Sequence, residues 1–98
     1  DKALAAADAM DGLRRAGAAP SRFAGIPIAI KDLFDIAGEV TTAGSKALAD
    51  QPPAATDAVA VARLRQAGLI LLGRAGMTEF AYSGLGMNPH YGDPRAPW

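Results

Sequence analysis

Lys31 is the residue of this 98-residue chain whose position most needs a chemical explanation. It lies in the stretch Gly25–Asp32, where the apolar run from Ile26 to Ile30 predicts a buried β-strand. A lysine at the end of a core strand has two interpretations. Its ammonium can reach past the apolar residues into water, or a site with little water can favour the neutral amine, which then acts as a base. Composition alone leaves both open.

Other side chains with catalytic or metal-binding chemistry are few. His90 is the only histidine and there is no cysteine, so neither a metal site nor a Ser–His–Asp set is expected. Asp32 and Asp35 lie near Lys31 in the sequence and would keep its ammonium charged if they paired with it. Glu79 is interpreted as a helix cap or a structural partner.

The overall composition is that of a soluble globular protein, with half of the residues hydrophobic and a fifth charged. Ten basic residues balance ten acidic ones, which gives no indication of a nucleic-acid or membrane partner. No apolar run approaches the roughly 20 residues that cross a bilayer. Because the chain starts at Asp1 rather than methionine and stops at Trp98, we expect a piece of a longer polypeptide.

The spacing of apolar residues predicts two helices. Residues 2–16 form an expected amphipathic surface helix, with one apolar stripe made of Ala6, Ala9, Met10 and Leu13. A second helix is expected to begin at Thr56, as its N-cap, and to end at Gly68. Between the first strand and this helix, residues 33–56 predict a long loop with a helical turn within residues 46–51.

The run Leu69–Leu72 predicts a second strand, covered on both faces because it is continuously apolar. A strand, a crossover helix and a further strand make a βαβ unit with parallel strands, so the fold class is α/β. From Gly73 onward the chain is rich in glycine and turn-forming residues, with a short helix expected only in Met77–Tyr82. Segments that follow a strand in this way are where α/β proteins place their sites.

Three blocks of the sequence, in this order and at this separation, resemble the amidase signature family. They read Gly-Ile-Pro-Ile-Ala-Ile-Lys-Asp at 25–32, Thr-Thr-Ala-Gly-Ser at 41–45, and Met-Thr-Glu-Phe-Ala-Tyr-Ser at 77–83 running into Asn-Pro-His-Tyr-Gly at 88–92. The resemblance covers about residues 24–98. It implies an α/β amidase-signature fold with a mixed β-sheet core covered by helices, of which residues 1–98 are the N-terminal part of a single domain.

Members of that family hydrolyse or transfer amides with a serine nucleophile, a bridging serine in a cis peptide, and a lysine. By motif, Lys31 corresponds to that lysine. The chemistry agrees with the residue type, because a serine hydroxyl is a poor nucleophile until a base takes its proton. A neutral lysine can take that proton through the bridging serine and later return it to the leaving amine.

In the family the two serines belong to a Gly/Ser-rich loop that follows the Asn-Pro-His block, whereas this chain stops at Trp98. The resemblance therefore implies that the 98-residue chain alone is inactive. Ser45 and Ser83 are expected to be structural or pocket-lining. The resemblance also implies an acyl pocket bordered, by backbone more than side chains, by Phe80, Ala81, Tyr82 and Ser83.

Some positions depart from the family pattern. Asparagine is common where Gly76 and Ala96 stand and threonine where Asp93 stands, which concerns the local loop conformation. The tRNA-linked amidotransferase subunits tend to have Met-Gly-Ser where this chain has Tyr-Ser-Gly at 82–84, which favours a free-standing amidase.

The resemblance thus predicts a cytoplasmic amidase that acts on a small-molecule amide with no cofactor and no metal. Neither nucleic acid nor a membrane is expected as a partner, and a homodimer is left open. Two alternatives remain: the A-type subunit of a tRNA-dependent amidotransferase, and a non-catalytic fragment that only binds or packs.

Overall fold

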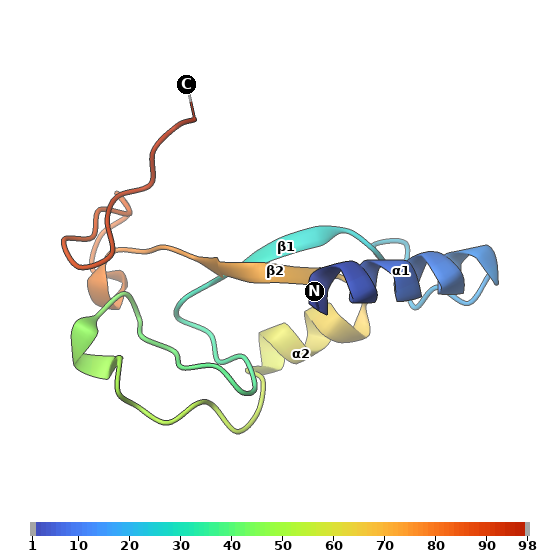
Figure 1. Cartoon of the computed structure of the whole chain (residues 1–98), viewed down its shortest axis with the longest axis horizontal. Coiled ribbons are helices and arrows are strands. Elements are labelled where there is room, and N and C mark those ends of the chain that lie inside the picture. The colour runs from blue at the N-terminus through green and yellow to red at the C-terminus, as the bar shows by residue number, and fades with distance from the viewer. Residues whose placement is uncertain (1, 98) are drawn as a thin grey trace.

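The computed structural model describes residues 2–97, which form two α-helices, two short 3-10 helices and a two-stranded sheet (Figure 1). In chain order the elements are α1 (Lys2–Arg15), β1 (Pro27–Lys31), η1 (Lys46–Leu48), α2 (Val59–Gln66), β2 (Ile70–Ala75) and η2 (Glu79–Ala81). None of these helices is long and apolar enough to span a membrane.

The two strands pair in parallel and α2 lies in their connection, which confirms the predicted βαβ unit. The pairing slips after Ile28, so that Leu72 is passed over as an extra residue of β2. It then resumes and brings Lys31 opposite Ala75. Strand β2 extends beyond the predicted Leu69–Leu72 because it stays paired with β1 to the last residue of that strand.

The apolar core lies between the sheet and α2. Ile30, Ile36 and Val61 are buried, and partly buried Leu64 and Leu71 pack against them. Val61 and Leu64 thus lie on the face of α2 that packs against the sheet, whereas Ala60 is exposed.

The prediction that β2 is covered on both faces is wrong for residues 2–97, because Leu72 is 63% exposed. Strand β1 is likewise only half-covered: Ile30 is buried whereas its neighbours Ala29 and Lys31 are not, as alternation along a strand requires.

Helix α1 begins and ends close to the predicted bounds, but its predicted apolar stripe is not buried. Met10 is half-buried, whereas Ala6, Ala9 and Leu13 are exposed. The helix packs beside β2, and the Arg14 guanidinium holds its C-terminal half by donating to a backbone carbonyl of the following loop. A sheet of two narrow strands offers too little apolar surface to cover a helix of this length.

The start of α2 differs from the prediction that Thr56 caps it. The helix begins at Val59 with Ala58 at the N-cap position, and no side chain caps it. The preceding Asp57 instead accepts a hydrogen bond from the Ala37 amide at 2.8 Å, which ties the helix entry to the loop after β1. Asp57 therefore joins two segments rather than capping one.

The end of α2 follows the prediction, because Gly68, which follows the C-cap residue Ala67, has a φ of +85°. Its amide donates to the Arg65 carbonyl at 2.9 Å, and its own carbonyl accepts from the Gly25 amide at 2.8 Å. A Cβ at this position would lie 2.9 Å from the Ala24 Cβ. Glycine is thus required both by the backbone conformation and by the close approach of the segment that leads into β1.

The loops also match their predictions. The helical turn expected within residues 46–51 is η1, and the short helix expected in Met77–Tyr82 is η2. In Figure 1 both lie beyond the carboxyl ends of the strands, together with the C-terminal segment.

Candidate functional site

Lys31 is the last residue of β1, so it lies at the carboxyl end of the parallel sheet. The residue is exposed, and its side chain makes no hydrogen bond or ion pair within residues 2–97. Both interpretations made from the sequence place it at a strand end, and the structure agrees. Its proposed role as a base stays a prediction.

The adjacent carboxylate of Asp32 binds the loop that follows rather than the lysine. Its oxygens accept hydrogen bonds from the amides of Thr42 and Gly44, each at 3.2 Å, and from the Thr42 hydroxyl. Asp35 accepts from the Thr41 hydroxyl at 2.7 Å. The alternative in which these two aspartates pair with Lys31 is therefore not found in the structure.

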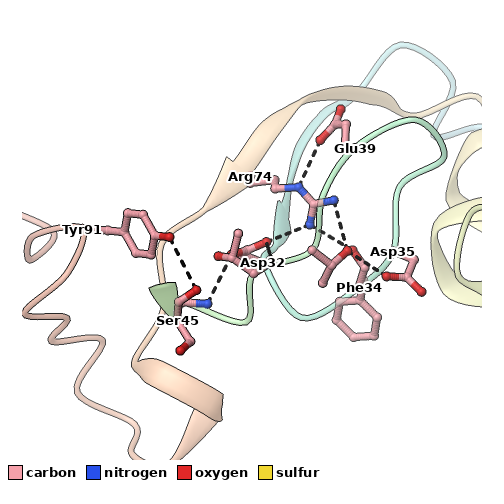
Figure 2. Close-up of polar contacts among 10 residues, drawn as sticks. Asp32, Phe34, Asp35, Glu39, Ser45, Arg74 and Tyr91 are labelled. Atoms are coloured by element: carbon pink, nitrogen blue, oxygen red, sulfur yellow. Dashed lines mark hydrogen bonds and ion pairs between the residues drawn. The ribbon is translucent and has the colours of Figure 1, made fainter. Parts of the chain in front are cut away.

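Arg74, the next-to-last residue of β2, also binds Asp32, at the oxygen that accepts from the Thr42 amide (Figure 2). Its Nη1 donates to Asp32 Oδ1 at 2.9 Å and to the Phe34 carbonyl at 3.1 Å, and its Nε donates to Glu39 Oε2 at 3.0 Å. The side chains of Arg74 and Asp32 are 17% and 14% exposed. This ion pair is thus largely removed from water, so loss of either partner would leave the other charge buried and uncompensated.

Ser45 is a structural residue, as expected. It is 1% exposed, its hydroxyl donates to Glu79 Oε1 at 2.6 Å, and it accepts from the Ala47 amide at the start of η1. The same Glu79 oxygen lies 3.2 Å from His90 Nε2. Glu79 therefore links η1, η2 and the C-terminal segment, in agreement with its interpretation as a structural partner.

Asn88 joins the loops at this end of the sheet. The residue is 3% exposed, and its Nδ2 donates to the carbonyls of Gly44 at 2.7 Å and Met77 at 2.8 Å. Its Oδ1 accepts from the amides of His90 and Tyr91, which closes its own turn. One side chain thus satisfies four backbone groups from three segments.

The predicted substrate-binding segment Phe80, Ala81, Tyr82 and Ser83 is exposed and has unusual backbone angles. Phe80 and Ala81 have φ values of 51° and 57°, which non-glycine residues rarely adopt. The Phe80 amide donates to the carbonyl of Ala43, itself at a φ of 51°. Such backbone strain is concentrated at functional sites. No hydrogen bond or ion pair of residues 2–97 joins this segment to Lys31.

A pocket of about 310 Å³ lies between the strand ends and the C-terminal segment. Its lining includes Asp32, Thr42, Arg74, Met77, Asn88 and Tyr91. Within residues 2–97 no three histidine, aspartate or glutamate side chains gather into a possible metal site.

Two residues of this region, Arg74 and Asn88, were missed in the sequence. Arg74 comes one glycine after the apolar run of β2, much as Lys31 follows that of β1, so a cation near the end of each of two parallel strands was an available signal. Asn88 precedes a proline and was interpreted as a turn former within the third block of the family resemblance, with no contact assigned to its side chain. Its contacts reach 44 residues back to the Gly44 carbonyl, and no local pattern predicts such a contact.

Comparison with known proteins places these features in a family. The model of the Amidase family matches residues 1–98. The chain is 50% identical over 97 residues to 1-carboxybiuret hydrolase subunit AtzE of Pseudomonas sp. (strain ADP), covering 99% of this chain and 21% of that protein. It is 45% identical to the A-type subunit of the glutamyl-tRNA(Gln) amidotransferase of Mycobacteroides abscessus, covering 100% of this chain and 20% of that protein.

Solved structures agree. A vestigial protein complex that bears on the origins of an s-triazine catabolic enzyme contains a chain that superposes with a TM-score of 0.85 at 50% identity, over 93% of this chain and 20% of that one. The peptide amidase from Stenotrophomonas maltophilia superposes with a TM-score of 0.72 at 40% identity, over 83% of this chain and 16% of that one. The chain spans about a fifth of the length of the curated relatives it matches.

Proposed function

Because the chain belongs to the amidase family, we propose that it supplies the lysine base of an enzyme that hydrolyses carboxylic amides through a Ser–cis-Ser–Lys triad. One observation carries the proposal: Lys31 lies at the carboxyl end of a parallel strand with its side chain unpaired within residues 2–97. A lysine without a carboxylate partner loses its proton more readily than one that is paired.

In this proposal the amine of Lys31 receives the proton of the nucleophilic serine through the bridging serine. The serine oxygen, freed of its proton, attacks the carbonyl carbon of the amide, and the C–N bond breaks as the lysine ammonium returns the proton to the leaving amine. Water then hydrolyses the acyl ester, which releases the carboxylic acid and restores the serine hydroxyl. Both serines would come from sequence beyond residues 1–98. Ser45 and Ser83 do not replace them, since the first is buried against Glu79 and the second accepts a hydrogen bond from the Leu85 amide.

The segment from Phe80 to Ser83 is proposed to border the acyl side of the substrate. Its support is the strained backbone at Phe80 and Ala81 together with the exposure of all four residues. The bond from the Phe80 amide to the Ala43 carbonyl fixes the segment against the loop that Asp32 holds next to Lys31. This chain of contacts would set the distance between the base and the acyl pocket.

The test is amide hydrolysis by the intact protein, measured as ammonia release from propionamide, benzamide, biuret and an amidated dipeptide. We expect Lys31→Ala to lower the rate about a thousandfold, within the range of general acid–base catalysis. Lys31→Arg should be equally damaging because a guanidinium does not give up its proton at neutral pH. Lys46→Ala, at an exposed lysine of η1, is the matched control. Near-normal activity of either Lys31 variant in a protein with unchanged circular dichroism would refute the base role.

A second candidate is the A-type subunit of a tRNA-dependent amidotransferase, which the identity of 45% to the Mycobacteroides abscessus protein favours. That activity would appear as ammonia release from glutamine that depends on added partner subunits. Hydrolysis of the simple amides without partners favours the free-standing enzyme. Failure of both assays would favour the non-catalytic alternative, in which the chain only binds or packs.

A further inference from the structure

The Phe80–Ser83 segment has few anchors of its own. The strained φ angles of Phe80 and Ala81 persist only where neighbouring parts of the chain impose them. The Phe80 amide donates to the Ala43 carbonyl at 2.8 Å, whereas the next two amides bond only to carbonyls of the preceding turn. No side chain of the segment makes a hydrogen bond or ion pair outside residues 78–85 within the described residues 2–97. One backbone bond is thus the segment's own hydrogen-bonded link to a distant loop, so the contacts of the residue that precedes it become important.

Glu79, directly before the segment, joins it to the loop of residues 41–45. Its Oε1 accepts a hydrogen bond from the Ser45 hydroxyl at 2.6 Å, and Ser45 is 1% exposed. The same hydroxyl accepts from the Ala47 amide at 3.2 Å, so its one proton is left for the carboxylate. The carboxylate of Glu79 is therefore held by a buried group that belongs to another loop.

The same oxygen of Glu79 also contacts the C-terminal segment. Oε1 lies 3.2 Å from Nε2 of His90, whose backbone amide donates to Asn88 Oδ1 at 2.8 Å. The side chains of His90 and Glu79 are 33% and 38% exposed, so this contact is partly shielded from water. Two donors from two different loops thus converge on one carboxylate oxygen next to the strained backbone.

These contacts favour a positioning role for Glu79 over a part in the chemistry. Within residues 2–97 its carboxylate makes no hydrogen bond or ion pair to Lys31, and Glu79 does not line the pocket of about 310 Å³. Because Phe80 follows Glu79 directly, however, displacement of the carboxylate also displaces the backbone of the segment. The side chain can therefore act on a substrate only through the residues that follow it.

We propose that Glu79 is a positioning residue that sets the acyl selectivity of the enzyme, by holding the Phe80–Ser83 segment against the loop that contains Ser45. The inference rests on the proposed function, in which this segment borders the acyl side of the substrate. Without the carboxylate the segment relaxes from its strained conformation. An acyl group that extends far toward the segment then loses more contacts than a short one, so benzamide should be affected more than propionamide.

The first measurement is hydrogen exchange of the intact protein, read by mass spectrometry of peptic peptides. In Glu79→Ala we expect the peptide that contains Phe80 to exchange about tenfold faster through local opening, whereas the peptide that contains β2 should not change. Glu79→Gln keeps an oxygen acceptor at the same reach and should exchange like the unaltered protein. Asp50→Ala is the matched control, because the exposed Asp50 side chain makes no hydrogen bond or ion pair within residues 2–97.

The second measurement is kcat/KM for benzamide and for propionamide, whose acyl groups differ in size. Glu79→Ala should lower the ratio of the benzamide constant to the propionamide constant about tenfold, less than the roughly hundredfold cost of a 1 Å misplacement. A general loss of folded protein lowers both constants equally and leaves their ratio unchanged. Glu79→Gln should keep the ratio of the unaltered protein, as should Asp50→Ala.

A folded Glu79→Ala protein in which either the exchange at Phe80 or the selectivity ratio is unchanged overturns the inference. If this variant does not fold, Ser45→Ala and His90→Ala decide. Each removes one of the two donors and should shift both measurements in the same direction to a smaller extent, and no shift in either variant overturns the inference. If the unaltered protein hydrolyses neither amide, the proposed function fails, and the exchange measurement alone decides whether Glu79 positions the segment.

Discussion

Replacement of Asn88 is the sharpest test of how the site is assembled. Asn88 is 3% exposed, and Asn88→Ala removes the two N–H donors of its side chain that bind the carbonyls of Gly44 and Met77. A buried carbonyl left without a donor costs about 1–2 kcal/mol, within the range for buried unsatisfied groups, so the two together cost about 3 kcal/mol. The amides of His90 and Tyr91 lose their acceptor as well, but they lie in an exposed turn where water replaces it.

The measurement is the urea midpoint of the intact protein, with the slope of the transition as a check that the same surface unfolds. Asn88→Asp separates charge from shape. The aspartate side chain has the same size as asparagine and keeps an acceptor, but at pH 7 its carboxylate faces two carbonyl oxygens, so the stability of the variant should be low. Stability should recover as pH falls, because the protonated carboxyl group can donate a hydrogen bond to a carbonyl. Ser83→Ala, which removes one exposed capping bond, is the control and should cost less than about 1 kcal/mol. An Asn88→Ala loss as small as the control would refute the view that this side chain holds the loops together.

Two further predictions concern stability. Gly68→Ala should destabilise the protein by about 2–4 kcal/mol in the same urea assay, because a Cβ would lie 2.8 Å from the nearest side-chain carbon and the backbone has a φ of +85°. Gly12→Ala, which adds a Cβ in open space within α1, is the control and should stabilise the protein by about 0.5–1 kcal/mol. Equal changes in stability for the two variants would contradict the argument. The pKa of Asp57 lies below the ordinary value because the Ala37 amide donates to it and Arg65 pairs with it. The Asp57 carboxylate therefore stabilises the folded protein above the unfolded-state pKa near 3.8, and this stabilisation is lost as pH falls through the lower folded-state pKa. Asp57→Asn should then flatten the fall in thermal stability between pH 4 and pH 2. An unchanged pH dependence in the variant would count against this role of Asp57.

The parts of the fold that depend on local pattern could be predicted from the sequence. The strand ending at Lys31, the helix with Val61 inward and the stop at Gly68 follow from apolar spacing and from the conformational freedom of glycine. The cap was misplaced at Thr56 because Asp57 makes a contact 20 residues back, and a distant partner outweighs a local preference.

The candidate site was less predictable for the same reason. Lys31 stood out because a charge follows an apolar run. The residues that organise its surroundings act over separations of 34 to 44 residues, as in the bonds from Arg74 to Asp32, from Asn88 to Gly44 and from Ser45 to Glu79. Such partners are chosen by the parallel pairing of the strands and by the path of the loops, which a pattern of residue types along the chain does not encode.

The two ends of this structure are therefore stabilised by different forces. Beside α2 the sheet is held by apolar packing around Ile30 and Val61, and β2 leaves Leu72 uncovered within residues 2–97. At the carboxyl ends of the strands the loops are held by directional bonds to Asp32 and Asn88. Hydrogen bonds to buried groups fix distance and angle, whereas apolar packing tolerates exchange of similar side chains. The position of the Phe80–Ser83 segment relative to the lysine thus depends on a few polar side chains rather than on the size of the core.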